Sequence, residues 1–107
     1  MKLSELVQVR QEQCPKCVSY TYLLPHNIDR ELCMALQIFG PSKYNLKVVK
    51  LFKVEFDDWY LECIQGTKTV KLWFKKALGD EIGCKIELFR GCLIEWLSNN
   101  LDSDIEE

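Results

Sequence analysis

The chain has 107 residues, of which 48% are hydrophobic and 28% are charged, and its formal net charge is −2. This length suits one domain around one core, and the composition excludes a disordered chain. No run approaches the ~20 apolar residues of a membrane-spanning helix, and the polar N-terminal residues do not resemble a signal peptide. We therefore expect a cytoplasmic protein without a membrane segment, whose six cysteines are reduced.

The charge is unevenly distributed. Residues 43–76 hold eight lysines and four acids, a net charge of +4, whereas the rest of the chain holds six basic and twelve acidic residues, a net charge of −6. Acidic flanks of this kind suit a protein that occupies a basic groove on a larger partner.

The first elements are expected to be a short helix and a strand. Leu3, Leu6 and Val7 follow helical spacing, and Arg10 occupies the next position of the same spacing. Residues 18–24 are rich in β-branched and aromatic side chains and are followed by Pro25, which predicts a strand.

An amphipathic helix is predicted between Asn27 and Gly40. Asn27 is a suitable N-cap, and Asp29 and Glu31 lie in the first turn, where the helix dipole favours acids. The apolar face of this helix consists of Ile28, Leu32, Ala35, Leu36 and Phe39.

Three strand-like runs follow, at 46–56, 59–65 and 68–76. The first run alternates with one slip near Val48 and Val49, which indicates a bulge. Turns at Asp57-Asp58 and Gly66-Thr67 are too short for crossovers, so the runs should form an antiparallel meander.

The last predicted element is a helix between Asp80 and Leu101. Its apolar stripe consists of Ile82, Ile86, Phe89, Leu93, Trp96 and Leu97.

The order (α)β-α-β-β-β-α predicts an α+β fold, a two-layer sandwich with the meander packed against two amphipathic helices and the N-terminal strand extending the sheet. We expect one domain over residues 1–101 and a frayed acidic tail over residues 102–107.

Alternation along the strands predicts which side chains lie on the sheet face away from the helices. These are Tyr60, Lys71, Trp73 and Lys75, joined by Lys53. Such a face can be merely solvated. It can also bind a protein, because exposed Trp and Tyr are common interface anchors, or nucleic acid, with bases stacked on the aromatic rings.

Groups for catalysis are few. The one histidine, His26, precedes a helix in a turn, and the chain has no phosphate-binding, dinucleotide-binding, nucleophile-elbow or H-E-x-x-H motif. We expect a protein that is not an enzyme.

The stretch C-P-K-C at Cys14 and Cys17 leads into a strand, whereas redox C-x-x-C pairs usually begin a helix. A C-x-x-C turn that precedes a strand is better suited to a zinc knuckle. Zinc takes four ligands, however, and this turn supplies only two. If zinc binds, Cys14, Cys17, His26 and Cys33 are the candidate ligands. We favour two reduced thiols in a turn, and no cofactor.

The sequence therefore predicts a small non-catalytic protein-interaction module, an adaptor or inhibitor that modulates a larger protein. The alternatives are a single-stranded nucleic-acid-binding domain that uses the same sheet face and a small zinc-stabilised domain. The oligomeric state stays open.

Overall fold

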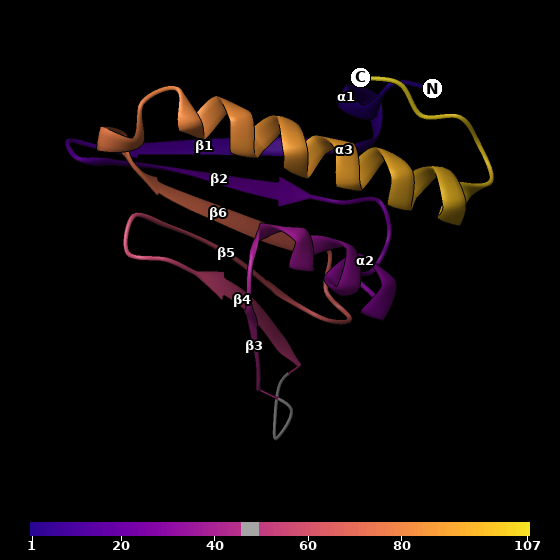
Figure 1. Ribbon diagram of the computed structural model, residues 1–107. Coiled ribbons are helices and arrows are strands. Elements are labelled where there is room, and N and C mark those ends of the chain that lie inside the picture. Colours follow the sequence, from indigo (N-terminus) through magenta and orange to yellow (C-terminus); the bar gives the residue numbers. More distant parts are fainter. Residues whose placement is uncertain (46–49) are drawn as a thin grey trace.

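The chain folds into an antiparallel sheet with its longer helices on one face (Figure 1). The computed structural model describes residues 1–45 and 50–107. Along the chain the elements are α1 (Leu3–Leu6), β1 (Gln8–Cys14), β2 (Cys17–Leu23), α2 (Arg30–Ala35), the 3-10 helix η1 (Leu36–Phe39), β3 (Ser42–Asn45), β4 (Leu51–Glu55), β5 (Trp59–Ile64), β6 (Thr69–Lys75), the 3-10 helix η2 (Lys76–Leu78) and α3 (Glu81–Leu101).

Within the described residues the sheet has six strands in the order β1-β2-β6-β5-β4-β3, and every neighbouring pair is antiparallel. β1 and β2 form a hairpin, and the chain then passes through α2 to the opposite edge. From β3 it returns strand by strand until β6 pairs with β2. The predicted meander is thus β4-β5-β6, and the predicted N-terminal strand extends it as β2.

The core lies between the sheet and the helices. Alternate residues of the inner strands face it, and the apolar sides of α2 and α3 close it. Its largest fully buried side chains are Phe52, Phe74, Phe89, Ile28, Leu32, Leu36, Leu61, Leu72, Leu93, Leu97, Val54 and Val70. In the described ranges no polar or charged residue is buried, so removal of apolar surface from water is the main force that joins the layers.

Asp29 joins the two longer helices. Its side-chain oxygen accepts a hydrogen bond from the backbone N–H of Leu32 at 3.0 Å and another from the indole N–H of Trp96 on α3, also at 3.0 Å. Asp29 is therefore the N-cap of α2, and the prediction of Asn27 was wrong. Asn and Asp are both good N-cap residues. Asp29 rather than Asn27 is the cap because its backbone is extended and its side chain lies beside the Trp96 indole.

The two termini lie side by side (Figure 1). Lys2 and Glu106 form a parallel bridge, and the backbone N–H of Glu106 donates to the carbonyl of Met1 at 2.8 Å. Ile105 is buried in the core. The tail that we expected to fray is thus held by backbone bonds and by one apolar side chain.

The predicted α+β two-layer sandwich is confirmed, with differences at both edges of the sheet. The N-terminal helix is a single turn, because from Gln8 onward the chain pairs along its whole length with β2. The sheet also gains β3 before the predicted meander. The bulge predicted at Val48 and Val49 lies outside the described residues. No helix in the described ranges is long and apolar enough to cross a membrane.

Candidate interaction surface on the open sheet face

Tyr60 and Trp73 lie at the centre of the sheet face away from the helices. They are direct partners in the register of β5 and β6. Their rings stack with centroids 5.4 Å apart and an interplanar angle of 18°. The residues on either side of them in sequence, such as Leu61 and Leu72, are buried in the core. The strand alternation therefore fixes both rings on the open face.

Two lysines flank the aromatic pair. The ammonium of Lys53 on β4 lies 4.5 Å from the centroid of the Tyr60 ring, and that of Lys71 on β6 lies 5.9 Å from it. Both distances are within the range of a cation–π interaction. We call Lys53, Tyr60, Lys71 and Trp73 the aromatic platform. All four are half-buried, so each side chain is held by its neighbours and still reaches solvent.

Acids balance the lysines of this face. Lys53 lies 3.0 Å from a carboxylate oxygen of Glu55 and 3.7 Å from one of Glu62. The hydrogen bond to Glu55 raises the pKa of the Lys53 ammonium above its ordinary value. Lys53 is therefore a fixed part of the platform rather than a freely moving charge.

Lys75 lies apart from the aromatic platform. Its ammonium is 3.6 Å from a carboxylate oxygen of Asp58 in the turn between β4 and β5. Lys53, Lys71 and Lys75 thus share the face with the carboxylates of Glu55, Glu62 and Asp58.

Sequence reasoning gave the side of the sheet for each predicted residue but missed these ion pairs. The signal was present in the turn at Asp57-Asp58. A two-residue connection there pairs Phe56 with Trp59, and the backbone N–H of Phe56 donates to the carbonyl of Trp59 at 2.8 Å. Counting back from that pair places Lys53 opposite Glu62, as observed.

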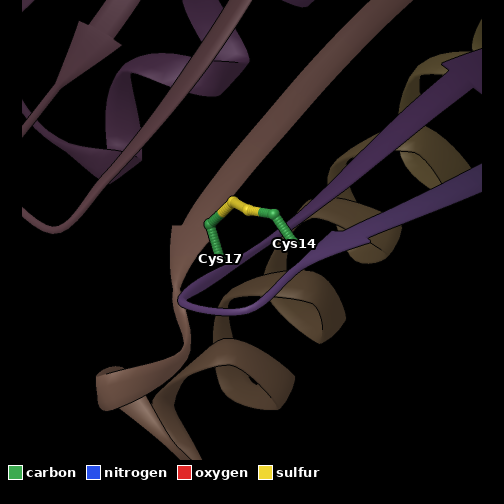
Figure 2. Close-up of a disulfide and its surroundings, with 2 residues drawn as sticks. All are labelled: Cys14 and Cys17. Carbon is green, nitrogen blue, oxygen red and sulfur yellow. A yellow bond between two sulfur atoms is a disulfide. The ribbon is translucent and has the colours of Figure 1, made fainter.

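Cys14 and Cys17 form a disulfide across the β1–β2 turn (Figure 2). The prediction of reduced thiols was wrong for this pair, because the two-residue turn at Pro15 and Lys16 sets the cysteines directly opposite each other, with Cα atoms 5.1 Å apart. That separation is within the usual range for a disulfide. Cys63, Cys84 and Cys92 are thiols outside this disulfide, and Cys33 contacts Cys63.

The four candidate zinc ligands are not brought together. Cys14 and Cys17 lie at one end of β2, and His26 follows the other end, about 20 Å away for a strand of this length. Cys33 is buried beside Cys63, and the hydrogen bond between the two thiols, together with burial, raises the pKa of Cys63. His26 instead packs edge-on against Trp96, with ring centroids 5.6 Å apart. In the described ranges no group of three or more His, Cys, Asp or Glu side chains gathers as metal ligands do.

A separate groove of about 480 Å³ lies in the helix layer. Met34 and Ile38 line it from α2 and η1, and Cys92 and Trp96 line it from α3. It lies on the opposite side of the sheet from the aromatic platform, so residues of this groove serve as controls for any test of the platform.

Comparisons with protein-family models, with curated proteins and with solved structures found no match to this chain. The function proposed below therefore depends on the geometry of the open face.

Proposed function

We propose that this protein is a non-catalytic interaction module, an adaptor or inhibitor, which binds a larger protein through the aromatic platform. The stacked pair of Tyr60 and Trp73 is the observation that carries the proposal. Tyr and Trp are enriched among the residues that contribute most to protein–protein affinity. Because the two rings are already packed on each other, binding costs them little side-chain entropy.

The ion pairs of Lys53 and Lys75 support a protein partner over nucleic acid. Binding to phosphates takes a surplus of positive groups and is strongly salt-dependent. Here Lys53 and Lys75 are already paired with carboxylates. The aromatic platform therefore offers a partner apolar ring surface with a polar rim, which is the usual composition of a protein interface.

The test is affinity capture followed by binding measurements with the purified partner. Tyr60→Ala and Trp73→Ala should each weaken binding about 30-fold, which corresponds to the ~2 kcal/mol of a residue central to an interface. Met34→Ala removes an exposed apolar side chain from the helix layer and should leave affinity unchanged. If both aromatic variants keep the natural affinity, or if no protein binds saturably, the proposal is wrong.

Single-stranded nucleic acid is the second candidate, since stacked aromatic rings flanked by Lys71 also suit bases. A titration of labelled oligonucleotides at low and high salt separates the two proposals. We expect no binding at low salt. Binding that weakens with salt and is lost in Trp73→Ala would replace the protein partner by nucleic acid.

We also propose a cytoplasmic location, which the thiols of Cys63, Cys84 and Cys92 support, because they form no disulfide. The Cys14–Cys17 disulfide is unusual for that compartment. Alkylation of thiols in intact cells before lysis is the test. A cytoplasmic protein should be labelled at Cys14 and Cys17 at least in part, whereas complete protection of this pair would indicate an oxidising compartment.

A further inference from the structure

β1 is an open edge of the sheet, and its two charged residues, Arg10 and Glu12, have opposite signs. Edge strands are normally kept from pairing with other chains by charged side chains, especially lysine, by proline, by bulges or by very short length. β1 has seven residues, contains neither lysine nor proline, and pairs without a bulge along its whole length with β2. All seven of its residues are exposed.

The backbone bonds already made by β2 show which groups of β1 face the free edge. The N–H of Leu24 donates to Lys68, and the N–H of Lys76 donates to Lys16, so even-numbered residues of this segment bond toward β6. Backbone groups alternate in direction along a strand. Odd-numbered β2 residues therefore bond β1, and their partners in β1 are the even-numbered residues.

The odd-numbered residues of β1 consequently point their N–H and C=O groups away from the sheet. These are Val9, Gln11 and Gln13. An antiparallel strand placed along this edge can bond all three. Two copies of β1 related by a two-fold axis at Gln11 do so symmetrically, because Gln11 pairs with itself and Val9 pairs with Gln13 of the other copy.

The charges of β1 select this register. With the axis at Gln11, Arg10 of each copy lies opposite Glu12 of the other, in the closer, non-hydrogen-bonded type of pair. An axis at Arg10 or at Glu12 would instead place like charges directly opposite each other, which is unfavourable. Arg10 and Glu12 are highly exposed, with 80% and 63% of their side-chain surface accessible, and they already lie 3.1 Å apart within one chain.

We infer that β1 pairs with β1 of a second copy of this chain, antiparallel and centred on Gln11, to form a symmetric dimer with one continuous sheet. The axis is perpendicular to the sheet, so both copies direct the aromatic platform to the same side. The dimer offers two platforms to one partner, and it forms whether or not the platform binds protein.

Sedimentation equilibrium over a range of concentrations tests the dimer. Arg10→Glu and Glu12→Arg should each raise the dimer dissociation constant about tenfold or more, because each change makes both cross-copy pairs repulsive. The double variant Arg10→Glu with Glu12→Arg restores opposite charges at both pairs and should restore dimerisation. Lys68→Glu, in the β5–β6 turn, changes the net charge as much as Arg10→Glu and should have no effect.

Amide hydrogen exchange supplies a second readout that is independent of the variants. The amides of Arg10 and Glu12 should be protected in monomer and dimer alike, whereas those of Val9, Gln11 and Gln13 should be protected only at concentrations that favour the dimer. The inference is wrong if the natural protein stays monomeric at millimolar concentration. It is equally wrong if the dimer tolerates both single variants, or if the double variant fails to restore it while circular dichroism shows all variants folded.

Discussion

Alternate residues of the same strands form the two faces of the sheet, and the two faces have different roles. On β6, Val70, Leu72 and Phe74 are fully buried against the helices, while Lys71 and Trp73 lie between them on the open side. The covered face holds the layers together by apolar burial. The open face has an aromatic pair and paired charges, which the fold does not need for its core.

This contrast teaches that exposure alone does not identify the candidate surface. Large apolar side chains such as Ile38 and Leu88 are exposed on the helix side, and single exposed apolar residues are common on proteins. The open face is distinguished by the arrangement of its side chains. Two aromatic rings are stacked, Lys53 and Lys71 lie over one of them, and carboxylates of Glu55 and Glu62 pair with Lys53.

The largest expected change in stability is that of a core residue on β6, and its neighbour on the open face gives the comparison. Leu72→Ala should lower the free energy of unfolding by about 2–5 kcal/mol, since it leaves a cavity in the core. Trp73→Ala should cost about 1 kcal/mol, chiefly the stacking on Tyr60. Urea denaturation of both variants gives the comparison. Equal losses would mean that the open face also carries the stability of the fold.

The next effect concerns the hydrogen bonds through which Asp29 connects α2 and α3. Asp29→Ala removes the cap of α2 and leaves the Trp96 indole N–H without its acceptor, so we expect a loss of about 2–3 kcal/mol. Asp29→Asn keeps an oxygen acceptor and a good cap, and it should cost less than about 1 kcal/mol. If denaturation curves show similar losses for both variants, the bond to Trp96 is not what joins the helices.

The covered face should also respond to alkali. Burial raises the pKa of Tyr22 from its ordinary value of 10.0 to about 12. The folded protein therefore holds this proton more tightly than the unfolded chain, and the resulting stability is complete below pH 10 and is lost as the pH rises toward 12.

Tyr22→Phe isolates this contribution. The natural protein should lose about 2–3 kcal/mol more than the variant between pH 10 and pH 12. Denaturation at several pH values measures the difference, in which contributions common to both proteins cancel. Parallel pH profiles for the two proteins would show that the Tyr22 hydroxyl titrates as it does in water.

A smaller effect is expected at β1, which is buried on neither face. Its attachment depends on backbone bonds to β2 and on the Cys14–Cys17 disulfide. Replacing both cysteines by serine should cost up to about 2 kcal/mol, the value for so short a closed loop. Amide exchange should rise mainly near the turn. An unchanged midpoint of unfolding would show that backbone pairing alone holds the hairpin.

The sequence was most informative where apolar residues recur with a clear period. Alternation located β5 and β6 and assigned Tyr60 and Trp73 to the open side, and the apolar stripe located α3. The periodicity of apolar residues did not predict β1. Its sequence Q-V-R-Q-E-Q has no apolar alternation, and it is a strand only because it pairs with β2. The cap at Asp29 depends on Trp96, which is 67 positions away and beyond the reach of local patterns.

The disulfide was missed for a different reason. We inferred the state of all cysteines from the expected compartment, whereas the pairing of Cys14 with Cys17 follows from a two-residue turn that sets them opposite each other. The ion pairs of the open face likewise follow from the register, which the turn at Asp57-Asp58 determines.

The most direct test of the open face uses the indole N–H signals of the three tryptophans in a ¹⁵N-labelled sample titrated with the purified partner. Trp59 and Trp96 are buried on the helix side, and Trp73 lies on the open face. We predict that the Trp73 signal shifts or broadens as the partner is added while the other two stay in place. Saturated binding that leaves the Trp73 signal unchanged would contradict the account.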